Sequence, residues 1–301
     1  MVKDSNSSSI HLRPDEGRSF LEMDDKRIIL AVYAHPDDGE FLAGGTLAKW
    51  VEEGHQVYVI CSTNGNLGTK DITISQEILA DTRKKELAEA MKVIGGNPPI
   101  FLGYDDGFLR ENIIDLKENL VYWFRKLKPD WIITFDPWKT YEIHPDHIEV
   151  GRMASEAAVF SCFPLLYPEH MKKGLEPHQP KELWYMTPME HKPNRLVDIS
   201  GTFGKKIEAI LCHQSQVEML ADMFITGADP TNLTHEQKAQ LQEGTKTLMQ
   251  MASQAMASLS EGKVELAEAF YAIKVGAGHF DNYQEMLQEM IGMDTDLLII
   301  M

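Results

Sequence analysis

The stretch Tyr33-Ala34-His35-Pro36-Asp37-Asp38-Gly39-Glu40 decides how the rest of the chain is arranged. It follows the apolar run 27–32, which has the continuous hydrophobic character of a buried strand. An imidazole and two carboxylates directly after such a strand are costly for folding and useful for chemistry. Because open α/β sheets bind their ligands at the carboxyl ends of their strands, we expect this turn to belong to a functional site.

Strand and helix patterns alternate from this stretch onward. The expected elements are strands at 27–32, 57–60, 100–102 and 131–135, and helices at 39–53, 75–94 and 116–127. This alternation predicts an α/β fold with a mainly parallel sheet that carries helices on both faces. We expect residues 1–24 to form a flexible arm and residues 25–301 a single domain.

The C-terminal part has less regular patterns. They predict a helix at 144–160, short strands at 183–186 and 195–199, a helix from 205 to 212, and a helix from 234 to 259. The last helix begins with Thr234-His235-Glu236-Gln237, the pattern of a capping box. The sheet is therefore expected to carry a C-terminal extension of helices and short strands.

The composition excludes several classes of partner. The chain of 301 residues has 46 acidic and 29 basic residues, with a formal net charge of −17. Nucleic acids and anionic membranes select clustered lysine and arginine, so we expect neither as a partner and favour a small-molecule substrate. No apolar run reaches the ~18 residues of a membrane span, and residues 1–16 lack the apolar segment of a signal peptide. Three widely spaced cysteines suit a reducing compartment, so we expect a cytoplasmic protein.

A second histidine turn, His144-Pro145-Asp146-His147, follows the expected strand at 131–135. If the first and fourth strands are neighbours in the sheet, both turns open onto the same crevice. Catalytic zinc sites usually take three protein ligands and leave the fourth position to water, whose pKa falls to ~7. The spacing lets His35 and Asp38 face one point, and His147 can supply the third ligand.

Three neighbouring residues suit the chemistry around such a metal. Asp37 points to the side of the expected ligands and suits the role of general base. His144, held by Asp146 or another carboxylate, can stay protonated and stabilise an oxyanion or protonate a leaving amine. These groups together predict metal-assisted hydrolysis of an amide or an ester.

Each motif taken alone also has an interpretation without function. A single His-Pro-Asp fits a turn in which an aspartate caps a helix, and a single His-x-x-His fits an exposed helix surface. Both motifs at the ends of buried strands favour a metal site. The pair Gly44-Gly45 suggests a dinucleotide-binding loop, but no G-x-G-x-x-G follows the strand, so nucleotide binding is not expected.

Residues 34–40 together with the turn 144–147 resemble the signature of the PIG-L/LmbE-like zinc deacetylases, and the resemblance covers most of residues 27–216. That family removes acetyl groups from N-acetylglucosamine units of small conjugates and uses a Rossmann-like domain. Within it, the chain is most similar to the diacetylchitobiose deacetylase type. The shared pieces are Asp136-Pro137-Trp138, Tyr141-Glu142, His191-Lys192-Pro193-Asn194, Val197-Asp198-Ile199 and His213-Gln214-Ser215-Gln216.

The resemblance implies roles for the residues of the two turns. By position, His35, Asp38 and His147 would be the ligands of one zinc ion per chain, although Fe²⁺ and Co²⁺ suit the same donors. Asp37 would be the base, and His144 would assist the transition state.

The resemblance also implies sites outside the two turns. Arg83 and Asp106 match positions that hold sugar hydroxyls, and His279 resembles a C-terminal histidine that reaches an active site in the chitobiose branch. The segment 217–261 is longer than in compact members, so we expect a helical insertion there. The apolar tail 297–301 would suit a subunit contact, and we expect a homo-oligomer, either a trimer or a hexamer.

The sequence therefore predicts a cytoplasmic, zinc-dependent N-deacetylase that acts on a small molecule containing N-acetylglucosamine. Two alternatives stay open. One is an esterase or a deacetylase of a non-sugar amine. The other is a metal-stabilised binding protein without turnover, although such a protein has no reason to keep Asp37 as a base that binds no metal.

Overall fold

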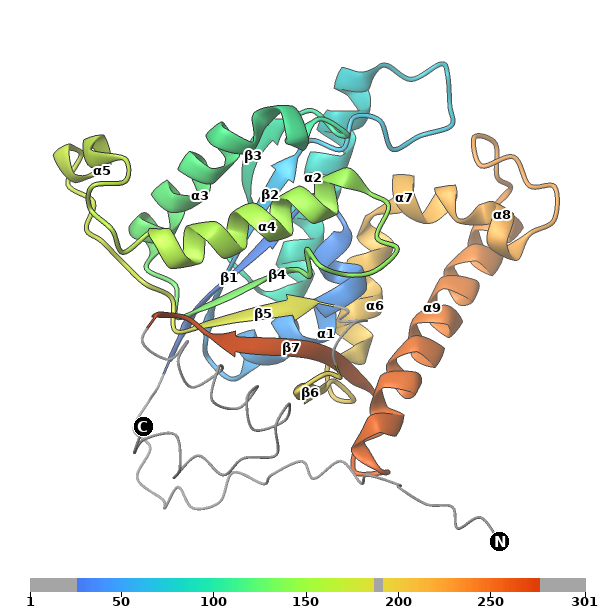
Figure 1. Cartoon of the computed structure of the whole chain (residues 1–301). Coiled ribbons are helices and arrows are strands. Elements are labelled where there is room, and N and C mark those ends of the chain that lie inside the picture. Colours follow the sequence, from blue (N-terminus) through green and yellow to red (C-terminus); the bar gives the residue numbers. More distant parts are fainter. Residues whose placement is uncertain (1–25, 187–191, 277–301) are drawn as a thin grey trace, which may run out of the picture.

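The computed structural model of the protein describes residues 26–186 and 192–276. Within these residues, seven strands form one sheet in the order β3-β2-β1-β4-β5-β7-β6 (Figure 1). The strands are β1 (Ile28–Tyr33), β2 (Gln56–Thr63), β3 (Ile100–Tyr104), β4 (Trp131–Phe135), β5 (Glu182–Met186), β6 (Arg195–Asp198) and β7 (Ala267–Lys274). The predicted arm 1–24, His191, His279 and the tail 297–301 lie outside the described residues.

Helices lie at the predicted positions, and three short helices, at 168–172, 214–219 and 221–224, were not predicted. The α-helices are α1 (Asp38–Glu52), α2 (Gln76–Ile94), α3 (Ile113–Leu127), α4 (Pro145–Phe160), α5 (Pro168–Lys172), α6 (Phe203–Cys212), α7 (Gln214–Met219), α8 (Ala221–Phe224) and α9 (His235–Ala257). Two 3₁₀ helices, η1 (Leu109–Asn112) and η2 (Ser258–Ser260), complete the described elements. None of the described helices is both long enough and apolar enough to cross a membrane.

The sheet confirms the predicted α/β fold. Strands β3, β2, β1, β4 and β5 run parallel to one another, while β7 is antiparallel to both β5 and β6. Because the chain goes from β1 outward to β2 and β3, and then returns to β4 on the other side, the strand order reverses at β1. The loops after β1 and β4 therefore open at the topological switch point, where such sheets bind ligands.

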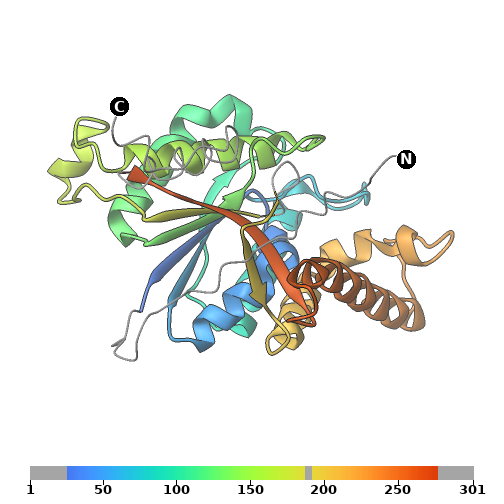
Figure 2. The same cartoon turned by 60° about the horizontal axis from the view of Figure 1, so that its bottom comes forward.

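Helices cover both faces of the sheet, as predicted. Helices α3 and α4 pack against each other on one face, while α1, α2 and α6 pack together on the other. Figure 2 shows the two layers on opposite sides of the strands, with α9 beside the edge that β6 and β7 form. Strand β1 is covered from both sides, and Ile29 to Ala34 are completely buried. This burial accounts for the uninterrupted apolar run in the sequence.

The C-terminal part differs from the prediction in one strand. Strand β7 (Ala267–Lys274) was not predicted, although it joins β6 to the rest of the sheet. The capping box at the start of α9 is confirmed: the side chain of Thr234 accepts from the Gln237 backbone N–H, and the Gln237 side chain accepts from the Thr234 N–H. Helix α9 packs on α7 and α8 and on β7. That segment 217–261 is an insertion stays a prediction.

Candidate active site

The two histidine turns meet, as the expected strand order requires. The turn after β1 supplies His35, and the start of α4 supplies His144 and His147. The ring centroid of His35 lies 4.4 Å from that of His144 and 5.2 Å from that of His147. Residues far apart in the sequence thus form one cluster of imidazoles beside the carboxylates of Asp37 and Asp38.

Asp38 lies between the other two predicted ligands, His35 and His147. One carboxylate oxygen of Asp38 lies 3.4 Å from Nδ1 of His35, and its other oxygen lies 3.4 Å from Nε2 of His147. Donors on a tetrahedral zinc ion, each ~2.0–2.2 Å from the metal, lie roughly 3.4 Å from one another. Two imidazole nitrogens and a carboxylate oxygen are also the donor types that zinc prefers. The residues present therefore fit a divalent cation.

Among the described residues, two groups of three donors that include His35 have all their donor atoms within 4.8 Å of one another. One combines His35 with His144 and His147, and the other combines it with Asp106 and Asp146; the predicted set of His35, Asp38 and His147 is not one of these groups. The second group explains how His35 is oriented. Its Nε2 lies 3.0 Å from Oδ1 of Asp106 and 3.4 Å from Oδ2 of Asp146. Metal-binding histidines usually donate their second N–H to a carboxylate, so these two residues suit a supporting role.

Backbone groups hold Asp146 in place. Its carboxylate accepts hydrogen bonds from the backbone N–H groups of Gly107 and Leu109, at 2.6 Å and 3.1 Å, and its side chain is completely buried. The sequence predicts that Asp146 or another neighbouring carboxylate holds His144. In the structure the Asp146 carboxylate contacts His35 directly, and its charge acts to raise the pKa of the nearby His144.

His147 has a supporting carboxylate that the sequence analysis did not assign. Its Nδ1 lies 3.4 Å from Oε1 of Glu142, and the same oxygen accepts the backbone N–H of His144 at 3.1 Å. The imidazole also stacks on the ring of Phe135 at the end of β4, with centroids 4.1 Å apart and planes 10° from parallel. The stacking on Phe135 fixes the plane of the imidazole, and the contact with Glu142 fixes which edge of the ring faces the site. In the sequence, the only sign of this contact is that Glu142 comes two positions before the His-x-x-His motif.

Opposite charges in the site favour an ionised Asp38 and a protonated His35, so a cation would have to displace the proton of His35. Burial opposes ionisation of Asp38, but the neighbouring His35 and His147 outweigh it and lower the pKa of this carboxyl. Burial likewise acts to lower the pKa of His35, whereas Asp38, Asp106 and Asp146 raise it well above its usual value. The carboxylates thus stay ionised and concentrate negative charge around the imidazoles.

Asp37 has a strained backbone and a carboxylate that Arg83 holds. It is the residue before α1, and its φ of 144° lies in a region that side chains other than glycine rarely adopt. Oδ1 of Asp37 accepts from Nη2 of Arg83 at 3.1 Å. Burial raises the pKa of Asp37 to about 6, although the Arg83 guanidinium acts in the opposite direction. A carboxyl with this pKa accepts and returns protons readily near neutral pH.

His144 differs from the expectation of a protonated imidazole. Burial, together with the charges of His35 and His147, lowers its pKa, so the neutral ring is favoured. Its side chain is 39% exposed, the most accessible of the three histidines, and its Nε2 lies 3.9 Å from Oδ1 of Asp106. A neutral imidazole in this place still has one N–H to donate to a substrate oxygen.

His213 and Glu40 form a buried ion pair near Asp37, which was not predicted from the sequence. Nε2 of His213, from the junction of α6 and α7, lies 3.2 Å from Oε2 of Glu40 in α1, and both side chains are completely buried. Burial alone would lower the pKa of His213, but Glu40 and Asp37 raise it. In the sequence, His213 stands out only because His213-Gln214-Ser215-Gln216 belongs to the family resemblance, which implies no role for it.

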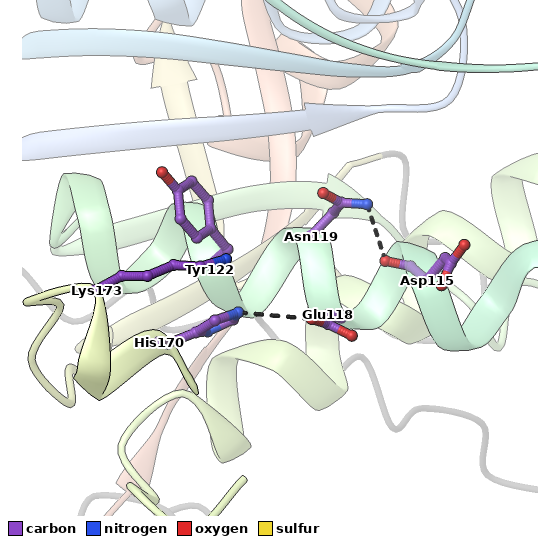
Figure 3. Close-up of a pocket in the computed structure, with 6 residues that line it drawn as sticks. All are labelled: Asp115, Glu118, Asn119, Tyr122, His170 and Lys173. Carbon is purple, nitrogen blue, oxygen red and sulfur yellow. Dashed lines mark hydrogen bonds and ion pairs between the residues drawn. The ribbon is translucent and has the colours of Figure 1, made fainter. Parts of the chain in front are cut away.

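A second cluster with metal-binding residue types lies at the other end of α4. Glu118, Glu169 and His170 have donor atoms within 4.8 Å of one another. Glu118 and His170 line a cavity of about 440 Å³, and Figure 3 shows the two side chains pointing toward each other. Nη1 of Arg125 lies 3.1 Å from Nδ1 of His170 and can only donate. Nε2 of His170 therefore carries the hydrogen and points to Glu118, 3.8 Å away. An Nε2 that carries a hydrogen has no lone pair for a cation, so this cluster lacks the donors of a metal site.

The fold and the two turns thus define an α/β protein with a candidate hydrolytic metal centre at the carboxyl ends of β1 and β4. The PIG-L family model, described as GlcNAc-PI de-N-acetylase, matches residues 30–158. Diacetylchitobiose deacetylase of Thermococcus kodakarensis is 33% identical over 193 residues, which are 64% of this chain and 71% of that protein. A probable N-acetyl-alpha-D-glucosaminyl L-malate deacetylase 2 of Bacillus cereus is 29% identical over 65% of this chain and 87% of its own length.

A solved structure agrees with these relatives. N,N′-diacetylchitobiose deacetylase from Pyrococcus horikoshii, in complex with an inhibitor, superimposes with a TM-score of 0.70. The match covers 83% of this chain and 84% of that one, at 28% sequence identity. The chain belongs to the PIG-L family, as the two turns predicted, and this places it among enzymes that act on amide bonds.

Proposed function

We propose that this protein is a metal-dependent N-deacetylase that removes the acetyl group from an N-acetylglucosamine unit of a small molecule. Its named relatives, diacetylchitobiose deacetylase and a glucosaminyl malate deacetylase, support this substrate class. The observation that carries the proposal is the arrangement of Asp38 between His35 and His147. Each of its two oxygens lies 3.4 Å from one of these imidazoles, while the neighbouring Asp37 is bonded to Arg83 instead.

The proposed ligands are His35, Asp38 and His147, with one zinc ion per chain. A divalent cation held there supplies a Lewis acid and lowers the pKa of water to ~7. Asp106 and Asp146 orient His35, and Glu142 orients His147, so the ligands are held in place by a second layer of carboxylates.

In the proposed reaction Asp37 takes a proton from the attacking water. As the water oxygen bonds to the acetamide carbon, negative charge develops on the carbonyl oxygen, and an N–H of His144 donates to it. A donor placed in this way is typically worth ~3–4 kcal/mol in barrier height. Asp37 then returns the proton to the departing nitrogen, the C–N bond breaks, and acetate and a free amino sugar leave. A pKa of about 6 suits Asp37 to both proton transfers.

Other predictions from the sequence become part of this proposal. Arg83 and Asp106 stay candidates for binding sugar hydroxyls, and His279 for a catalytic contact from the C-terminal segment. The cytoplasmic location and the trimeric or hexameric assembly are also proposed. Light scattering coupled to gel filtration measures the assembly directly.

An acetate-release screen tests the proposed function. N-acetylated sugars are incubated with the purified protein, with the protein after removal of metal by a chelator, and with the stripped protein after addition of zinc. We expect acetate from N-acetylglucosamine compounds, loss of release with the chelator and recovery with zinc. Turnover of simple acyl esters without any N-acetylhexosamine would favour the esterase alternative. No turnover, with a tightly held zinc, would favour a binding protein.

A further inference from the structure

Helix α9 packs on the fold with one side and exposes the other. It lies on the side of the molecule opposite α5 (Figure 1, Figure 2). Its buried residues, Leu241, Thr245, Ser253 and Ala257, are spaced by four or eight positions and so share one side of the helix. Met251 lies on the opposite side and is 63% exposed. The side around Met251, called the outer face of α9 below, is therefore open to solvent.

An apolar groove runs between the outer face and α8. It has a volume of about 510 Å³, and Phe224 of α8 lines it together with Gly244, Thr247, Leu248 and Met251 of α9. A Cβ at Gly244 would lie 2.6 Å from Cδ1 of Phe224. A glycine inside a helix costs ~1 kcal/mol relative to alanine, and here it lets the phenylalanine ring lie directly against α9. The groove thus has an apolar floor beside the exposed methionine.

The outer face carries no charge over the last turns of the helix. From Thr247 to the end of α9 at Ala257, the sequence has no acidic or basic residue. Nearer the start of the helix, the exposed carboxylate of Glu243 lies 3.9 Å from the ammonium group of Lys246. The whole chain, by contrast, has a net charge of −17. Because such a charge makes two copies of the chain repel each other, contact between copies is least opposed at an uncharged face.

We propose that the outer face of α9 is a contact between two copies of this chain that are related by a two-fold axis. Such an axis sets the same face of both copies against each other, so a charged face would meet its own like charge and an uncharged face does not. Met251 lies near the middle of the uncharged stretch. Its flexible thioether enters the groove between α8 and α9 of the second copy, since methionine adapts to irregular apolar surfaces.

This contact narrows the proposed assembly. A two-fold contact joins chains in pairs, so the assembly has an even number of chains. Of the trimer and the hexamer proposed above, only a hexamer built from two trimers contains such an axis. The contact uses neither the proposed metal ligands nor Asp37, so it stands independently of the proposed function.

Light scattering coupled to gel filtration of the full chain tests the contact through charge. Thr247→Glu combined with Gln254→Glu adds two carboxylates to the outer face of each copy, at exposed positions. Like charges across a contact cost several kcal/mol, so the Kd between copies should rise at least ~10²-fold and the measured mass should fall by half. Thr247→Gln, which adds bulk without charge, is the matched control and should keep the wild-type mass. High salt should restore the assembly of the charged variant by screening, which it would not do for a misfolded chain.

A cysteine at position 251 tests the two-fold axis itself. Because the axis brings this residue close to its own counterpart, Met251→Cys should give a covalent dimer with a short bismaleimide cross-linker. The wild type, which keeps Cys162 and Cys212, and Ile114→Cys, at an exposed position of α3, are the controls and should run as single chains on a denaturing gel.

Three outcomes would overturn the inference. A wild type that is a monomer or a trimer lacks the contact. A wild-type mass that the doubly charged variant retains at low salt would place the contact between copies elsewhere. Loss of the assembly in that variant, without cross-linking at position 251, would mean that the outer face of α9 meets a different segment of the second copy.

Discussion

The carboxylate of Asp38 lies 3.4 Å from Nε2 of His147, although one residue begins the helix after β1 and the other lies in the first turn of the helix after β4. This contact depends on β1 and β4 being neighbours, since only then do their carboxyl ends open onto one crevice. The order of the strands thus brings the two histidine turns together in one candidate site.

Replacing Asp37 should lower activity without loss of zinc, whereas replacing His147 should lower both activity and zinc content. Asp37→Asn keeps the donors of the proposed metal site and should retain zinc while activity falls 10²- to 10⁴-fold, the usual contribution of a general base. His147→Ala removes a donor and should lose zinc as well as activity. Elemental analysis of the two purified variants, beside acetate release, distinguishes them. Equal loss of metal in both variants would contradict the division between base and ligand.

Glu142 should affect the affinity for metal without being a ligand. Glu142→Gln removes the charge that faces Nδ1 of His147 but keeps an oxygen for the backbone N–H of His144. We expect zinc to bind 10- to 100-fold more weakly, as for other residues that orient a ligand. Competition with a chromogenic chelator measures this change. Glu111→Gln, at an exposed position of η1, is the control, and the prediction is wrong if both variants bind zinc as the wild type does.

Arg125 should stabilise the segment that leads from α4 to α5. Its guanidinium donates to four backbone carbonyls, those of Ser161, Phe163, Leu166 and Tyr167. Arg125→Met leaves the buried carbonyl of Ser161 unsatisfied and removes the donor of three part-buried carbonyls, so we expect a loss of ~1–3 kcal/mol or more in the free energy of unfolding. Urea denaturation measures the loss. Lys92→Met, whose side chain is 70% exposed and pairs with a carboxylate that is 61% exposed, should change stability by no more than ~0.5 kcal/mol.

The pair His213–Glu40 should make stability depend on pH. Because the folded-state pKa of His213 is raised, against the effect of burial, by Glu40, Asp37 and Glu86, the folded protein holds this proton more tightly than the unfolded chain. The stabilisation is therefore complete below the unfolded pKa of ~6.5 and is lost as the pH rises through the folded pKa.

Thermal unfolding of the wild type and of His213→Gln from pH 5 to pH 9 checks this sign. The Tm advantage of the wild type should shrink as the pH rises. His235→Gln, at an exposed position of α9, should leave the pH profile unchanged. An advantage that grows with pH would mean that His213 is buried in its neutral form.

The strands that could be predicted from the sequence are those buried on both faces of the sheet, because such strands have continuous apolar sequences. Strands β1 and β4 are continuous apolar runs, and the two histidine turns follow them directly. Strand β7 escaped prediction because small residues, Ala267, Ala269 and Ala272, occupy several of its buried positions and have little strand preference. The apolar spacing of residues 75–94 also predicts that Ile78 faces inward, and this is wrong: Ile78 lies in the first turn of α2 and is 58% exposed.

The contacts that side chains make within the site were harder to predict than which side chains belong to the site. Glu142 and Arg83 support the site through bonds to His147 and Asp37, and such bonds depend on how loops and helices pack. No periodicity or motif spacing reports them. The tautomer that excludes a cation at His170 likewise follows from the guanidinium of Arg125, which reaches it from a different helix.

The central claim is that the two histidine turns hold one cation beside a carboxylate that does not bind it. Anomalous scattering at the zinc edge, from crystals of the zinc-loaded protein, tests it most directly. The account predicts one peak per chain, ~2.0–2.2 Å from donors of His35, Asp38 and His147, with Asp37 outside the coordination sphere and bonded to Arg83. A peak bound by Asp37, or one held by Glu118, Glu169 and His170 in its place, would contradict it.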